Sequence, residues 1–333
     1  MTVDKEYCIS NRLLWIDVLK GMGIIYVVIG HIFLNEVIFN WLYSFHMPLL
    51  FFVAGCVYHK KAVSMDLRRR IQTIVIPYFI FGGICLIYWL LVERRFRDST
   101  MGLERTLIGL LLGQYEFLDF NVHLWFLPCF FLTTILFNIL VNMGNRLTIS
   151  SKLAYIASFV MSIVYMICPL PEMPWGGNRV FKYIGFYAIG CFFSEQKVET
   201  YIQRQSGITK GIEVITLIGT NFVLTSYILT AGVMWFITAL IGVAGMTVLA
   251  LSIRENRVFQ YLGRISLVVL CMHGPVYRVV VKVISILLYM NTNTVRTNFA
   301  LTMLVLAITM VICSIIYEII VRIMPWVVGK TAK

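Results

Sequence analysis

The sequence is poor in charged residues, which excludes an ordinary soluble domain. Only 13% of its 333 residues are charged, whereas 59% are hydrophobic. Soluble domains carry about a quarter of their residues as Asp, Glu, Lys or Arg. Apolar runs of roughly 20 residues, enough to cross a hydrocarbon layer about 30 Å thick, recur along the whole chain. The composition therefore predicts a polytopic membrane protein.

Several chemical signatures are also missing from the sequence. The eight cysteines are scattered, mostly within apolar runs, and no two of them form a C-x-x-C pair. This argues against a disulfide framework and against a cysteine zinc site. Neither a G-x-S-x-G sequence nor a phosphate-binding glycine loop occurs. Since no basic stripe with interleaved aromatic residues occurs either, we expect no nucleic-acid partner.

The apolar runs predict an all-α fold, a bundle of about ten transmembrane helices. The expected spans are residues 13–34, 41–58, 71–92, 123–143, 153–170, 180–194, 211–229, 233–253, 265–290 and 299–323. The span at 180–194 is the weakest, because it is short and contains Lys182. Residues 104–118 are apolar but too short to span, which favours an interfacial or re-entrant position. We expect one transmembrane domain over residues 1–333 with no appended soluble domain.

The distribution of Lys and Arg predicts the orientation, because cytoplasmic connections carry the excess of these residues. If the N-terminus is cytoplasmic, 18 of the 28 Lys and Arg residues fall in inside segments and seven in outside connections. Both termini are therefore predicted to be cytoplasmic. The net charge of +12 then reflects topology and contact with the anionic surface of the lipid bilayer.

The first span contains three polar groups that are costly in lipid: Asp17, Lys20 and His31. Lys20 and His31 are eleven residues apart, so they share a helix face and lie roughly 16 Å apart along the axis. Asp17 is one turn before Lys20 and can pair with it. Ionisable groups within a span usually face the bundle interior or a water-filled cavity. The alternative is an interfacial Asp17–Lys20 ion pair with His31 at the opposite interface.

Further histidines fall at the same predicted depth as His31. His46 opens the second span and His123 opens the fourth, both toward the outer side, whereas His273 lies within the ninth span beside Gly274 and Pro275. The Gly-Pro pair is expected to loosen the helix and free backbone carbonyl groups.

A histidine is well suited to remove a proton from a hydroxyl group, so the pattern favours general-base chemistry. A metal bound by His31, His46 and His123 is an alternative, but these residues lack the i, i+4 spacing that would make it specific, and we expect no metal. The basic residues Arg68, Arg69 and Arg70 could hold the phosphates of a cytosolic cofactor. A topogenic charge run accounts for them equally well.

Five motifs, in this order, resemble the integral-membrane acyltransferase-3 family: DVLKGMGIIYVVIGH, FHMPLLFFVAG, RRRIQTIVIPY, HLWFL and LGRISLVVLCMH. The resemblance covers nearly the whole chain and is greatest to the fucose 4-O-acetylase-like branch, which includes surface-polysaccharide O-acyltransferases. Lys20 and His31 match the family's basic residue and essential histidine with ten residues between them. Lys20 departs from the usual Arg, and because Lys lacks the bidentate fork, it implies a point-charge contact to a phosphate.

The resemblance also implies roles for residues of the later motifs. His123 and Trp125 match a histidine–tryptophan motif and would line a sugar site, together with His46 and His273. His123 is also a candidate catalytic residue, with His31 and Asp17. Arg70 matches a motif that enters the third span. Ala54 and Leu270 depart from the family's usual Ser and Tyr.

The function implied by this resemblance is O-acylation of a sugar. Acetyl-CoA, or another acyl-CoA, would be the co-substrate, and a carbohydrate acceptor in a surface or lipid-linked glycan would receive the acyl group. His31 would act as base or acyl carrier and Asp17 would hold Lys20, which with Arg68, Arg69 and Arg70 would bind the donor. The expected location is the cell inner membrane. Two alternatives stay open: a glycan exporter or proton-coupled transporter, and a sensory membrane module.

Overall fold

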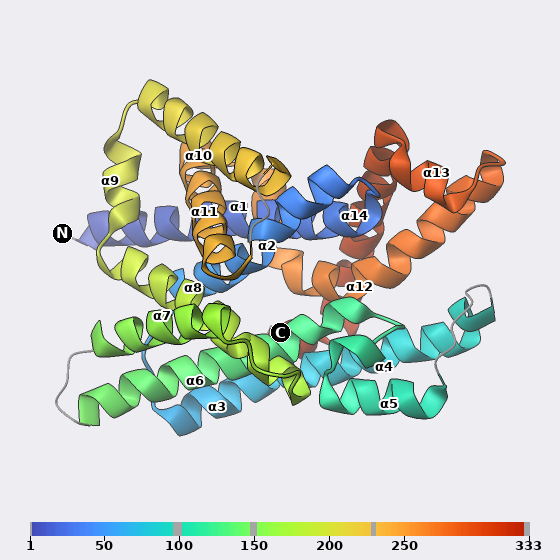
Figure 1. Ribbon diagram of the computed structural model, residues 1–333, viewed down its shortest axis with the longest axis horizontal. Coiled ribbons are helices and arrows are strands. Elements are labelled where there is room, and N and C mark those ends of the chain that lie inside the picture. The colour runs from blue at the N-terminus through green and yellow to red at the C-terminus, as the bar shows by residue number, and fades with distance from the viewer. Residues whose placement is uncertain (1, 96–101, 147–151, 228–230, 330–333) are drawn as a thin grey trace.

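A computed structural model describes residues 2–95, 102–146, 152–227 and 231–329 (Figure 1). Across these residues the chain is helical and contains no strand, which confirms the predicted all-α fold. The helices are α1 (Thr2–Ile32), α2 (Glu36–Cys56), α3 (Val63–Arg70), α4 (Ile76–Leu91), α5 (Leu103–Leu112), α6 (Phe126–Arg146), α7 (Lys152–Ile167), α8 (Gly177–Glu195), α9 (Val198–Arg204), α10 (Gly207–Tyr227), α11 (Gly232–Ile253), α12 (Arg257–Leu287), α13 (Thr292–Thr297) and α14 (Phe299–Ile323).

Each of the ten predicted spans overlaps a helix, and residues 228 and 229 of the predicted span 211–229 lie outside the described residues. Within the described residues, eight stretches are long and apolar enough to cross a membrane: α1, α2, the continuous stretch of α3 and α4, α6, α10, α11, α12 and α14. The other two predicted spans are α7, which is apolar but only 16 residues long, and α8, which carries Arg179, Lys182 and Glu195. α5 has ten residues, with Leu107 and Leu111 exposed, and is too short to span.

Basic segments that the sequence places in connections are partly helical. α3 covers residues 63–70 and runs directly into α4 through a π-helical turn at Ile71–Val75. Pro77 has no N–H group for the carbonyl of Thr73, so regular α-helical hydrogen bonding cannot continue there. α12 begins at Arg257 because the Asn256 side chain accepts hydrogen bonds from the first free N–H groups.

The connections gather at two ends of the bundle (Figure 1). The start of α1 and α9 lie at one end, where Arg254 donates to the carbonyl of Gln203. α13 lies at the opposite end, where the N–H of Leu34 donates to the carbonyl of Arg296. We name them the inner end and the outer end, after the orientation predicted from charge.

α1 and α12 pack against each other with almost no side-chain atoms between their backbones. A Cβ atom on Gly21 would collide with the carbonyl of Phe259, and one on Gly263 would collide with the carbonyl of Asp17. Small residues permit such close approach, which is a common basis of helix association in membranes. The contact sets Lys20 and His31 of α1 alongside α12.

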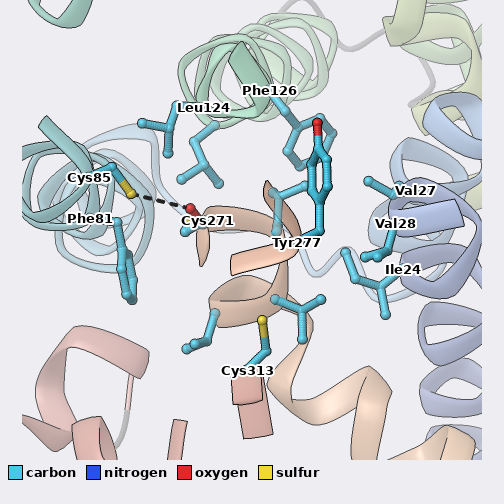
Figure 2. Packing of buried hydrophobic residues seen from close by; sticks show 14 of the residues in the cluster. Ile24, Val27, Val28, Phe81, Cys85, Leu124, Phe126, Cys271, Tyr277 and Cys313 are labelled. Carbon is cyan, nitrogen blue, oxygen red and sulfur yellow. Dashed lines mark hydrogen bonds between the residues drawn. The ribbon is translucent and has the colours of Figure 1, made fainter. Parts of the chain in front are cut away.

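The largest hydrophobic core fills the space between α1, α4, α6 and α12. Figure 2 shows part of this core, in which Ile24, Val27 and Val28 of α1 are buried together with Cys85, Cys271 and Cys313. The seven cysteines whose side chains the structure describes are free thiols, and all except Cys168 are buried. They pack as small apolar residues, as the sequence predicts; the eighth, Cys8, lies outside the described side chains.

Candidate active site

Three histidines from distant parts of the chain meet in the bundle near the outer end. The ring centroids of His31 and His123 are 4.0 Å apart, those of His123 and His273 are 4.1 Å apart, and those of His31 and His273 are 5.5 Å apart. His123 and His273 are buried, whereas His31 is partly exposed. We call these three residues the histidine trio.

The tautomer of His273 follows from its neighbours. Its Nδ1 atom lies 2.8 Å from the carbonyl oxygen of Val269 and 3.0 Å from that of Leu270. Carbonyl oxygens only accept hydrogen bonds, so Nδ1 must carry the proton. The Nε2 atom is then a free acceptor, and it has no hydrogen-bond partner within the described part of the chain.

Pro275 sets up the position of His123 through a freed carbonyl group. Because proline has no N–H, the carbonyl of Cys271 loses its usual helical partner. That carbonyl accepts from Asn121 Nδ2 at 2.7 Å and lies 3.6 Å from Cys85 Sγ (dashed line in Figure 2). The expectation that the Gly-Pro pair frees a carbonyl is confirmed, but α12 continues as an α-helix through both residues. The groups that contact the freed carbonyl are the Asn121 amide and the Cys85 thiol.

Asn121 in turn fixes the tautomer of His123. Since its amide nitrogen faces Cys271, its Oδ1 atom faces His123 Nδ1, 2.8 Å away. His123 therefore donates through Nδ1, and its buried Nε2 is an acceptor with no hydrogen-bond partner among the described atoms. Gly274 makes this contact possible, because a Cβ atom there would lie 2.7 Å from His123 Nδ1.

His31 is the member of the trio that reaches the surface. It lines a cavity of about 470 Å³ at the outer end, together with Phe39, Tyr43, Tyr277 and Arg296. Tyr43 Oη lies 2.9 Å from His31 Nδ1. The rings of Phe39 and Tyr43 are stacked with centroids 3.9 Å apart. A polar molecule that enters from the outer end therefore meets His31 first, beside aromatic rings.

A second cavity, of about 310 Å³, lies beside two cations, one on α1 and one at the C-terminal end of α3. Lys20 and Arg70 line its polar part, and Phe126, Phe130 and Leu270 are among its apolar lining. Leu270 is one helical turn from His273 on α12. The lining of this cavity thus extends from two cations to within one helical turn of His273.

The predicted pairing of Asp17 with Lys20 is present. Lys20 Nζ lies 2.8 Å from Asp17 Oδ1, and the Lys20 side chain is one-third exposed, at 34%. Arg70 pairs with the buried Asp66, with its Nε atom 3.3 Å from Oδ1. Arg68 and Arg69 are exposed and lie outside the cavity lining. Of the four predicted donor-binding cations, the structure brings together Lys20 and Arg70.

His46 and Trp125 lie away from the trio. His46 is buried, donates from Nδ1 to the carbonyl of Leu42 at 2.6 Å, and contacts the Tyr43 ring. It therefore supports Tyr43, which contacts His31. Trp125 packs under the Arg179 guanidinium, 4.8 Å from its ring centroid, and near Tyr183. His273 takes the place beside His31 and His123 that predicted depth in the membrane had suggested for His46.

Comparison with known protein families matches residues 13–318 to the acyltransferase-3 family, described as an acyltransferase domain. The chain belongs to the acyltransferase-3 family. Neither the curated proteins nor the solved structures gave a match. This acyltransferase-3 protein is accordingly a multi-pass membrane acyltransferase, as the motifs of the sequence had indicated.

The trio of this acyltransferase also has the spacing of a metal site. One ring nitrogen from each histidine can be chosen so that all three lie within 4.8 Å of one another. Nδ1 atoms that donate to backbone or amide oxygens, with Nε2 left free, also occur in metal-binding histidines. The same geometry would let His31 act as a base, with the proton that it takes up shared with the neutral imidazoles of His123 and His273.

Tyr43, Asn121, Tyr277 and Arg296 belong to the site but are not found from the sequence motifs. Arg296 donates to the carbonyls of His31 and Ile32, at 2.9 and 3.0 Å, and so holds the end of α1. Asn121 could have been suspected from the sequence, because it lies two residues before His123. The others come from segments whose contact depends on the three-dimensional arrangement of the helices.

Proposed function

We propose that this protein transfers an acetyl group from acyl-CoA, at the inner end, to a carbohydrate hydroxyl, at the outer end. The observation that carries the proposal is the position of His31, which lines the outer cavity while its trio partner His273 lies one turn beyond the inner cavity. With the orientation predicted from Lys and Arg, the donor enters from the cytoplasm. The protein would act in the cell inner membrane.

Lys20 and Arg70 are the proposed contacts for the CoA phosphates. Both are cations in the lining of the inner cavity, and each is paired with a carboxylate. The thioester arm would run along the apolar lining toward Leu270. Lys20 and His31 are separated by roughly 16 Å of helix, a distance that suits a donor with its charged group remote from the reacting thioester.

The outer cavity suits a sugar ring. Phe39, Tyr43 and Tyr277 offer aromatic surface, and the carboxylate of Glu36 and the amide of Asn35 supply polar groups that can bind hydroxyls. A site of this kind, apolar with a few placed polar groups, is typical of small-ligand binding.

The chemistry follows from the state of the trio. A ring nitrogen of His31 takes the proton of the acceptor hydroxyl, and the resulting oxygen attacks the thioester carbonyl carbon. The carbon–sulfur bond then breaks, and the leaving sulfur takes a proton from the His31 imidazolium, which restores the neutral base. The Nε2 atoms of His123 and His273 can accept hydrogen bonds, so they stabilise the imidazolium while it exists.

Purified protein in lipid nanodiscs tests the proposal. With acetyl-CoA and glycan extracted from cells that lack the gene, we expect thiol release and a new acetyl mass on the glycan. A surface glycan with unchanged acetylation but reduced amount in the deletion strain, together with no thiol release in vitro, would instead identify an exporter.

A further inference from the structure

A second cavity at the outer end adjoins the one that His31 lines. It has a volume of about 410 Å³ and is lined by residues at the end of α4, on α12 and on α13. Arg296 lines both cavities, so the two sites are neighbours. The acyl-transfer chemistry described above leaves this second cavity unused.

The cavity has an excess of positive charge. Arg278, Lys282 and Arg296 line it, and Glu93 is the one carboxylate in the lining. Arg278 is held by Glu93, with its Nε atom 2.7 Å from Oε1, and by the carbonyl of Phe120. The charge of Arg278 is thus balanced by Glu93, and the charges of Lys282 and Arg296 give the cavity its excess. Guanidinium and ammonium groups placed together are a common means of binding phosphate.

The rim of this cavity is apolar on the side away from the bundle. Ile87, Leu91 and Val92 of the α4 end are 58%, 61% and 42% exposed, and Val279 and Val283 of α12 are 42% and 48% exposed. In a membrane protein such side chains face lipid. The cations therefore lie next to hydrocarbon. A ligand that contacts both the cations and the apolar rim must have an anionic group joined to a hydrocarbon chain.

We propose that this cavity binds the phosphate or diphosphate of a lipid-anchored acceptor while the attached sugar extends past Arg296 to His31. This assignment rests on the proposed acyl transfer and names its acceptor class, a glycan still joined to its membrane carrier. It also predicts that acylation precedes release of the glycan from lipid.

Binding of a long-chain isoprenyl phosphate, measured in nanodiscs of neutral phosphatidylcholine, tests the site without any catalysis. We expect saturable binding to one site. Lys282→Glu should weaken it by about tenfold or more, because reversal of a nearby charge is felt strongly at low effective dielectric. Thr292→Glu, in the same lining, should act in the same direction. Asn293→Glu adds the same charge on α13 at an exposed position outside the lining, and should leave binding unchanged.

Two further probes separate the possible sources of phosphate. Inorganic phosphate and phosphatidylglycerol at equal concentration should fail to displace the isoprenyl phosphate. Displacement by phosphatidylglycerol would make this a general phospholipid site and overturn the assignment, as would binding that Lys282→Glu does not change. Transfer of acetyl to a free glycan as fast as to a lipid-linked one would also overturn it, yet would leave acyl transfer standing. Isoprenyl phosphate binding with no thiol release would refute acyl transfer instead.

Discussion

The link between Pro275 and Asn121 yields a quantitative prediction. Asn121→Ala removes hydrogen bonds to the Cys271 carbonyl and to His123, at 2.7 and 2.8 Å. Side-chain hydrogen bonds between membrane helices contribute about 0.6 kcal/mol each. The Cys271 carbonyl then keeps only its weak contact with the Cys85 thiol, 3.6 Å away, and the loss of its strong partner costs about 1–3 kcal/mol. We expect a total loss of about 2–4 kcal/mol in the free energy of unfolding.

A second substitution isolates the carbonyl contribution. Pro275→Ala restores an N–H group four residues after Cys271, so the helix itself can satisfy that carbonyl. In this background Asn121→Ala should cost only about 1 kcal/mol, the two side-chain bonds. The two substitutions together should therefore cost less than the sum of the single effects by about 1–3 kcal/mol. Turnover should stay low in the double variant, because His123 still lacks Asn121.

Reversible unfolding in mixed micelles with increasing SDS, followed by tryptophan fluorescence, measures these differences. Asn142→Ala is the matched control, because Asn142 also donates to backbone carbonyls, those of Lys61 and Asn138, but far from Pro275. Its effect should add to that of Pro275→Ala. If Asn121→Ala and Pro275→Ala are additive within about 0.5 kcal/mol, Pro275 does not free the carbonyl that Asn121 uses.

Three further predictions concern the donor, the trio and the topology. Lys20→Ala should raise the dissociation constant of acyl-CoA while turnover at saturating donor is kept. Lys20→Arg and the exposed control Arg204→Ala should both bind acyl-CoA normally. Unchanged acyl-CoA binding in Lys20→Ala would assign Lys20 to structure alone. Treatment with EDTA should leave transfer intact, whereas a loss that zinc restores would show that the trio holds a metal. In a Cys168→Ser background, a membrane-impermeant maleimide applied to intact cells should label a cysteine at Glu36 and not one at Ser64; the opposite pattern would invert the orientation.

The fold could be predicted well from the sequence because its main determinant is local. Each span is a run of apolar residues, and in lipid such a run must form a helix to satisfy its backbone. The prediction was wrong mainly about where the helices begin and end. The connections at 59–70 and 254–264 are partly helical, because Lys and Arg have good helix propensity and polar segments can continue a span into water.

The site could be predicted only in part, for a geometric reason. Helical spacing relates Asp17, Lys20 and His31, which share one helix, and their relation holds in the structure. Depth in the membrane relates His31 to His123 but does not say which histidines face each other. The structure therefore puts His273, and not His46, beside His31 and His123, because the direction of a side chain depends on how α2 and α12 are rotated. Asn121 and Arg296 act through backbone carbonyls that no motif records.

The central claim is that His31 carries out the chemistry between two binding cavities, and one comparison tests it most directly. Acyl-CoA affinity and the rate of acetyl transfer at saturating donor are measured on purified wild-type protein, His31→Ala and the exposed control His59→Ala. Because a base acts mainly in the transition state, we expect His31→Ala to bind the donor normally and to lose transfer by about 10²–10⁴-fold, with His59→Ala unchanged. Transfer by His31→Ala at half the wild-type rate or more would contradict the account.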